Sequence, residues 1–301
     1  MSNLLLLIIC FVAGIILRNT GRFPESTPAA LNGFIIHVSL PALAILHLHK
    51  LSLDISLGYT AGMAWLLFTG GALFFYLAGR LAGLPRETVG ALMMVGGLGN
   101  TSFVGLPMIE AYYGREFLGV GIIADMCGSF LLLSTIGVMT AVSFSSGELS
   151  LRQMGRRILL FPPFQALLLA LLLRPVPFSA ELNTVLQRIG DTLTPLALAS
   201  VGYQLRLGEI RNVIKPLGLG LFYKLLLGPL FIYLLYVVIG GGNGTIMRVT
   251  IFEAAMAPMI SAGIVAVDHR LNPPLVTLMI GLGIPLSFLT LSIWWWFLQR
   301  V

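Results

Sequence analysis

The segment G-G-L-G-N-T-S-F-V-G-L-P, residues 96–107, decides the fold because it places helix-breaking and polar residues in the middle of an apolar stretch. It contains four glycines, one proline and three consecutive polar side chains. Relative to Ala, Gly costs about 1 kcal/mol and Pro about 3 kcal/mol in a helix interior. A backbone group freed in hydrocarbon costs several kcal/mol more unless protein, water or a ligand satisfies it. We therefore expect non-helical backbone around residues 100–107.

The surrounding chain is far more apolar than a soluble protein. Its 301 residues are 57% hydrophobic and 10% charged, with a mean hydropathy of +0.95. A membrane-spanning helix needs about 20 mainly apolar residues. Ten such stretches follow one another at residues 3–18, 28–47, 57–80, 87–113, 116–144, 157–174, 189–205, 213–239, 245–267 and 273–298. The sequence therefore predicts an all-α integral membrane protein with ten transmembrane helices.

The longest polar stretch, residues 143–157, divides these spans five and five. The second span reads H-V-S-L-P-A-L-A-I around Pro41, and the seventh reads D-T-L-T-P-L-A-L-A around Pro195. Because five is odd, a duplicated half must enter the membrane the opposite way up, which gives inverted repeats. We expect a first five-helix repeat at residues 1–144, a short cytoplasmic connector at 145–157 and a second repeat at 158–301.

The ninth span carries a second break, at the position that corresponds to the fourth span. It reads E-A-A-M-A-P-M-I-S-A-G over residues 253–263, with Pro258 near its middle, and we expect non-helical backbone around residues 257–261. Matched broken helices in inverted repeats are expected to cross near the bilayer centre, where half-helix N-termini can hold a carboxylate. Such an arrangement is typical of secondary transporters.

Three motifs resemble the auxin efflux carrier family, particularly its compact bacterial members, and the resemblance covers the whole chain. They are N-T-S-F-V-G-L-P at residues 100–107, E-A-A-M-A-P at 253–258 and K-L-L-L-G-P at 224–229. The resemblance implies the fold of the bile-acid sodium symporters, with a scaffold domain and a transport domain that moves like an elevator. It also implies a substrate such as malate, malonate, oxalate or an auxin-like weak acid. Plant exporters of auxin differ from this chain in their long central loop.

The same resemblance places Asn100 and the backbone at Pro107 and Pro258 in the anion site. Together with their neighbours in the two breaks, the expected substrate-binding residues are Asn100, Thr101, Ser102, Gly105, Pro107, Ala257, Pro258, Met259 and Ser261. Alternative interpretations remain at this stage. The polar residues could serve helix–helix hydrogen bonds, the glycines close packing, and the prolines simple kinks.

Three ionisable residues lie deep inside spans: Asp125, Lys224 and Glu253. An unpaired charge there is expensive, so each should have a partner or a function. One interpretation is a structural salt bridge from Lys224 to Asp125 or Glu253. The other is that one acid exchanges protons and couples transport, with Lys224 as a fixed countercharge or substrate contact. His37 is expected to be a packing residue, and Glu110 and Asp191 to cap helices or face water.

The distribution of Lys and Arg predicts that both termini lie outside, since this orientation puts eleven in cytoplasmic loops and six outside. We expect a homodimer in a bacterial cytoplasmic membrane, with a proton or sodium ion as coupling ion and neither cofactor nor metal. Nothing indicates nucleic-acid binding. An anion channel or membrane sensor with the same crossover site is the alternative function. An enzyme is not expected, because no nucleophile, metal-ligand or nucleotide-binding motif is present.

Overall fold

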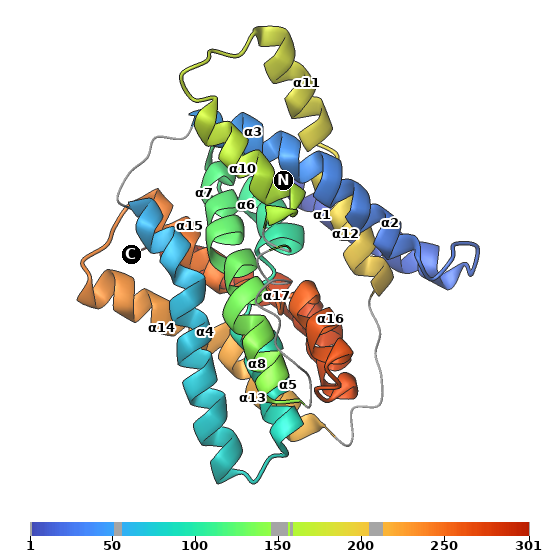
Figure 1. The fold of residues 1–301 in the computed structure, drawn as a ribbon, viewed down its shortest axis with the longest axis vertical. Helices are drawn as coiled ribbons and strands as arrows, with labels where there is room; N and C mark the ends of the chain where they lie inside the picture. Colours follow the sequence, from blue (N-terminus) through green and yellow to red (C-terminus); the bar gives the residue numbers. More distant parts are fainter. Residues whose placement is uncertain (1, 51–55, 146–155, 157–158, 205–212, 301) are drawn as a thin grey trace. The chain divides into compact units, whose positions relative to one another are not determined.

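The computed structural model describes residues 2–50, 56–145, 156, 159–204 and 213–300. Across these residues the chain is helical, with one isolated antiparallel bridge between two non-helical segments (Figure 1). Most of the expected connector, residues 145–157, lies outside the described residues. The all-helical class predicted from the sequence is therefore confirmed for the described chain.

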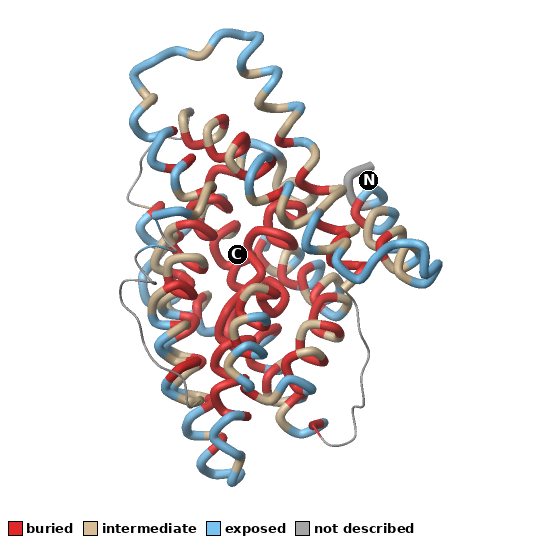
Figure 2. Tube along the Cα trace, turned by 45° about the vertical axis from the view of Figure 1, so that its right-hand side comes forward, coloured by how far each residue is buried: buried red, intermediate tan, exposed pale blue. Residues whose placement is uncertain are grey.

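Among the described residues, five helical stretches are long and apolar enough to cross a membrane. They are Thr27–His49, Ser56–Leu81, Arg115–Ser143, Ile214–Ile239 and Pro273–Leu298. Leu5–Asn19 and Pro162–Leu172 are shorter apolar helices. Exposed positions form stripes along individual helices in Figure 2. They include large apolar side chains such as Leu73, Ile293 and Leu289, which is expected where helices face lipid.

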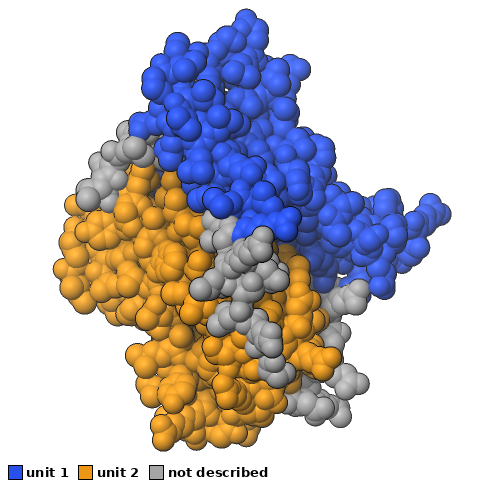
Figure 3. Space-filling model, in the orientation of Figure 1, with its two compact units in different colours: residues 1–54, 102–122, 155–205 blue, residues 55–101, 123–154, 206–301 orange. Residues whose placement is uncertain are grey.

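The chain forms two compact units, each assembled from separate parts of the sequence (Figure 3). Unit 1 contains residues 1–54, 102–122 and 155–205, and unit 2 contains residues 55–101, 123–154 and 206–301. Both units draw on both halves of the chain. The two compact units therefore differ in their boundaries from the two sequence repeats, which are expected to end at residue 144 and to begin at residue 158.

Unit 1 is built around α1 (Ser2–Asn19), which packs against α12 (Leu193–Gln204). A Cβ atom on Gly14 would come 2.1 Å from the Ala199 carbonyl oxygen, and one on Gly202 would come 2.1 Å from that of Phe11. The two backbones are therefore in direct contact, as small residues permit in membrane helices. The remaining elements are α2 (Thr27–Phe34), η1 (Ile35–Ser39), α3 (Leu40–Lys50), α6 (Leu106–Tyr112), η3 (Arg115–Phe117), α7 (Leu118–Ile123), α10 (Pro162–Leu172) and α11 (Ala180–Gly190).

The helix α11 differs from its neighbours because it is amphipathic and largely exposed, as its mostly pale blue trace at the top of Figure 2 shows. Ser179 caps its N-terminus by accepting a hydrogen bond from the Leu182 N–H at 3.2 Å. The Glu181 carboxylate accepts hydrogen bonds from its own backbone N–H and from the Ser179 side chain. Both lower its pKa, and the backbone hydrogen bond is the larger cause. This helix connects α10 to α12.

Unit 2 contains the two interrupted segments and the long helices around them. Its elements are α4 (Ser56–Leu81), α5 (Arg86–Gly97), η4 (Ala124–Phe130), η5 (Leu133–Gly137), α8 (Val138–Ser143), α13 (Ile214–Phe222), η6 (Tyr223–Leu227), α14 (Gly228–Tyr233), η7 (Leu234–Ile239), α15 (Thr245–Ala254), α16 (Ile260–Asp268) and α17 (Pro273–Leu298). Asn272 caps α17 and donates a hydrogen bond to Thr88 Oγ1 at 2.8 Å, which ties α17 to α5.

Candidate functional site

The first interruption begins where α5 ends at Gly97. Leu98 is extended, with φ −107° and ψ 134°, and residues 98–100 are non-helical. Gly96 and Gly97 belong to the helix, and each lies against an aromatic ring. A Cβ atom there would come 2.6 Å from Phe75 or 2.9 Å from Phe68. Close packing, the alternative interpretation of these glycines, therefore accounts for both of them.

The helix resumes earlier than the sequence predicted. Thr101 begins η2 (Thr101–Gly105), a π-helical turn that leads into α6. Pro107 is the second residue of α6 and follows directly on the π-helical turn η2. A proline cannot donate to the regular helical hydrogen-bond ladder, and that ladder is already interrupted by the π-helical turn. The expected non-helical backbone at residues 100–107 is thus wrong for 101–107, and the break covers residues 98–100.

The second interruption lies between α15 and α16. Ala255 forms a turn, and the extended Met259 precedes α16, which starts at Ile260. Because Ser261 is helical, the expected non-helical range of 257–261 is corrected to end at Met259. The α16 N-terminus has no side-chain cap, so its first N–H groups remain suited to an anion.

The two non-helical segments pair with each other. Gly99 and Pro258 form the antiparallel bridge. The Asn100 N–H donates to the Ala257 carbonyl at 2.8 Å, and the Met259 N–H donates to the Leu98 carbonyl at 3.2 Å. Each break thereby satisfies backbone groups freed by the other, which removes a cost that hydrocarbon would otherwise impose.

The expected site residues divide between the two units. Unit 2 contains Asn100, Thr101, Ala257, Pro258, Met259 and Ser261, whereas Ser102, Gly105 and Pro107 belong to unit 1. Asn100 and Thr101 are each 1% exposed. Ser261, in the first turn of α16, is partly exposed. The structure therefore brings together Asn100 and the second break, while the unit boundary passes between Thr101 and Ser102.

Lys224 lies at the centre of the buried charges. Its side chain is fully buried, and Nζ donates to the carbonyl of Ala254, the last residue of α15, at 2.9 Å. A cation at a helix C-terminus is favourable because the helix dipole is negative there. A Cβ atom on Gly99 would lie 3.1 Å from Nζ. The absent side chain of Gly99 thus leaves room for the ammonium group beside the crossing segments.

The two acids have different surroundings. Asp125, 2% exposed, accepts a hydrogen bond from the Thr101 hydroxyl at 2.6 Å. Glu253 is fully buried, and neither of its carboxylate oxygens has a hydrogen-bond partner among the described residues. Its charge interacts electrostatically with those of Asp125 and Lys224. Among the described residues, Lys224 Nζ hydrogen-bonds the Ala254 carbonyl and not the Glu253 carboxylate, and its pairing with one of the buried acids stays a prediction.

Three of these side chains lie in π-helical turns: Thr101 in η2, Asp125 in η4 and Lys224 in η6. Such turns are frequent at functional sites. The apolar surroundings of the buried charged residues indicated them in the sequence. The Ala254 carbonyl could not be predicted, because a backbone acceptor leaves no signal in the sequence. Glu110 and Asp191, which were expected to cap helices or face water, form ion pairs with Arg115 at 2.9 and 3.0 Å.

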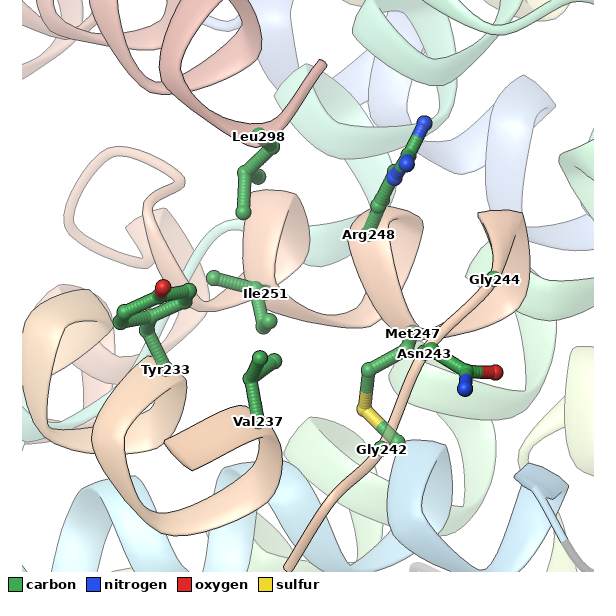
Figure 4. Close-up of a pocket in the computed structure, with 9 residues that line it drawn as sticks. All are labelled: Tyr233, Val237, Gly242, Asn243, Gly244, Met247, Arg248, Ile251 and Leu298. Atoms are coloured by element: carbon green, nitrogen blue, oxygen red, sulfur yellow. The ribbon is translucent and has the colours of Figure 1, made fainter. Parts of the chain in front are cut away.

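A separate small pocket in unit 2 does not suit a substrate. Its volume is ≈ 20 Å³, about the room that one water molecule needs. In Figure 4, Met247 extends toward Gly242 while the Arg248 side chain points the opposite way. The lining is mostly apolar. This pocket is therefore not an alternative to the paired breaks as a candidate site.

Known proteins resemble this chain over nearly its whole length. A family model described as a membrane transport protein matches residues 1–295. An uncharacterized transporter of Methanothermobacter thermautotrophicus is 26% identical over 297 residues, which cover 97% of this chain and 96% of that protein. An uncharacterized transporter of Methanocaldococcus jannaschii is 23% identical over 316 aligned residues, covering 99% of this chain and 98% of that protein.

Proposed function

Because this chain belongs to the membrane transport protein family, the auxin efflux carrier family that its motifs resemble, we propose that it is a secondary transporter of small organic anions. One observation carries the proposal. Two interrupted segments are paired through Gly99 and Pro258, and the uncapped N-terminus of α16 begins two residues after Pro258. Backbone N–H groups in the first turn of a helix favour a carboxylate. Malonate, malate and oxalate are the substrates proposed.

We also propose that the chain forms ten transmembrane helices in two inverted repeats. The helix packing supports this, because contacts between the two halves occur in corresponding pairs. In unit 1, α1 packs against α12, and the corresponding helices α10 and α3 of the opposite halves also pack together. In unit 2, α4 packs against α15, and the corresponding helices α13 and α5 pack together. The matched proline motifs also meet, since Ser39 and Thr192 are joined by a hydrogen bond of 2.7 Å.

The proposed mechanism is alternating access of the elevator type, in a bacterial cytoplasmic membrane with both termini outside and with a homodimer as the assembly. A channel with the same crossover site is the competing function. Counterflow of labelled malonate in proteoliposomes separates the two, because only a carrier accumulates label against an excess of unlabelled substrate inside. Rapid equilibration without transient accumulation, for malonate, malate and oxalate alike, would contradict the proposal.

We predict that Asn100→Ala weakens malonate binding by about 10- to 150-fold. The reason is that one hydrogen bond to a charged ligand contributes about 1.5–3 kcal/mol. Binding is measured by calorimetry on the purified protein, with unfolding temperature as the check on folding. Asn243→Ala, at an exposed turn of unit 2, is the matched control. Equal affinity in both variants would remove Asn100 from the site.

We further propose that transport is coupled to protons, with Glu253 as the proton-carrying group. A carboxylate buried without hydrogen-bond partners is costly when ionised, and this describes Glu253 among the described residues. Lys224 is already engaged by the Ala254 carbonyl. Asp125 is the alternative carrier.

The coupling prediction is that Glu253→Gln abolishes uptake driven by a pH gradient but retains exchange of labelled for unlabelled malonate at equal pH. Asp125→Asn serves as the comparison variant. Uptake is measured in proteoliposomes with and without a sodium gradient. If both variants keep full pH-driven accumulation, or if accumulation requires sodium and ignores pH, the acids have a structural role instead.

A further inference from the structure

Residues 102–122 belong to unit 1, although the chain on both sides of them belongs to unit 2. This segment, the 102–122 hairpin, contains most of η2, then α6, η3 and most of α7. Its two arms meet at Gly114, whose φ of 99° favours glycine. In unit 1, α6 packs against α1 and α12. The hairpin is thus held by helices from which it is distant in sequence.

Each end of the hairpin lies in or beside a π-helical turn. The boundary between residues 101 and 102 falls in η2, and the boundary between 122 and 123 falls one residue before η4. A π-helical turn interrupts the regular hydrogen-bond ladder, and such interruptions are where helices bend. Each end of the hairpin therefore lies at or next to an irregular turn.

The tip of the hairpin is attached to the turn between α11 and α12 by a polar network. Arg115 contacts Glu110 Oε1 through Nε at 2.9 Å and Asp191 Oδ1 through Nη1 at 3.0 Å. The Thr194 hydroxyl donates to Glu110 Oε2 at 2.9 Å. Gln187 donates to Asp191 Oδ1 at 2.8 Å. One guanidinium therefore bridges a carboxylate of the hairpin to a carboxylate of the α11–α12 turn.

The ion pairs of the network are partly exposed to solvent. The side chain of Arg115 is 51% exposed and that of Asp191 is 41% exposed, so water can replace either partner. Ion pairs in such surroundings are weak and are screened by salt. The contacts select one position of the hairpin without fixing it permanently.

We propose that Arg115, Glu110, Asp191 and Thr194 form a latch that holds the 102–122 hairpin on α12, and that the latch opens during the transport cycle. Opening lets the hairpin swing away from α12 about η2 and η4. This inference rests on the proposed transport function. It adds a named conformational step, at residues outside the anion site, to that function.

Hydrogen exchange of the purified, full-length protein tests the latch without any substrate. In Arg115→Gln, the amides of residues 106–117 are expected to exchange about fivefold faster than in the wild type. Arg188→Gln, at an exposed arginine of α11, should leave them unchanged. At about 1 M salt, where the Debye length is about 3 Å, the wild type should approach the variant. Equal exchange in all three proteins, independent of salt, would overturn the latch.

A reversible cross-link tests its role in transport. Cysteines replace Glu110 and Thr194 in a chain that also carries Cys10→Ser and Cys127→Ser, and a reducible thiol cross-linker joins them. Malonate counterflow should stop on cross-linking and return on reduction. Counterflow that persists with the link intact would refute opening of the latch. Absence of counterflow in the wild type would instead refute the proposed function, while hydrogen exchange would still decide whether the latch exists.

Discussion

Each unit contains a group of one cation and two acids, and the two groups differ in burial. In unit 2, Lys224 and Glu253 are fully buried and Asp125 is 2% exposed. In unit 1, the side chains of Arg115, Glu110 and Asp191 are 51%, 17% and 41% exposed. The exposed arginine contacts both of its acids directly, whereas the buried lysine contacts a backbone carbonyl.

Direct contact between opposite charges does not decide how much a charged group contributes to stability; its burial does. Water shares in solvating the Arg115 group, so losing one contact there costs little. The Lys224 group depends on a helix end, one hydroxyl and the charges of its neighbours. Removing one member leaves the others buried and uncompensated. Mutational effects should therefore be larger in unit 2 than in unit 1.

The largest effect is expected from Lys224→Met, which keeps the length of the side chain but removes its charge. It should lower the free energy of unfolding by about 3–5 kcal/mol, because breaking a buried set of charges leaves the remainder unpaired. Chemical unfolding in detergent measures it. Lys215→Met, at an exposed lysine of α13, should change stability by less than about 0.5 kcal/mol. Similar values for both lysines would break the comparison.

An intermediate effect is expected from Gly99→Ala. The new methyl group would lie 3.1 Å from Lys224 Nζ and 3.6 Å from the Glu253 carbonyl oxygen. Crowding a packed interior in this way costs about 1–3 kcal/mol. Gly218→Ala in α13 meets no atom within 4 Å, and should stabilise the protein by up to about 1 kcal/mol. Thermal unfolding of the two variants should shift in opposite directions, and a shared direction would contradict the prediction.

The smallest effect is expected from Arg115→Gln. Because its ion pairs are exposed, the free energy of unfolding should fall by about 0–1 kcal/mol. The difference from the wild type should disappear at about 1 M salt. Denaturant titrations at low and high salt measure this. A loss as large as that of Lys224→Met would show that the two groups are equivalent after all.

The exact position of the first break could not be predicted from the sequence. The sequence predicted a break at residues 100–107 because glycine, polar residues and proline gather there. In the structure, Gly96 and Gly97 remain helical and pack against Phe75 and Phe68, and Pro107 lies in α6 directly after the π-helical turn η2. Propensity locates the weak region, but the contacts of each residue decide which part of it leaves the helix.

The buried charges show the same division. Long apolar surroundings predicted that Asp125, Lys224 and Glu253 would be buried, and they are. Sequence spacing could not predict that Lys224 would contact the Ala254 carbonyl, because any backbone carbonyl nearby could accept its hydrogen bond. Nor could it predict the ion pair between Arg115 and Asp191, because these residues lie far apart in the sequence.

The sequence alone determined that this is an apolar, all-helical membrane protein of a transporter family, with weak points in its fourth and ninth apolar stretches. These properties follow from local composition, since the bilayer imposes helix length and the breakers act where they stand. Only the tertiary structure decided that Gly99 pairs with Pro258, that two discontinuous segments complete unit 1, and that Thr101 reaches Asp125. Those contacts join distant residues, and the free energy that selects them depends on the whole packed arrangement.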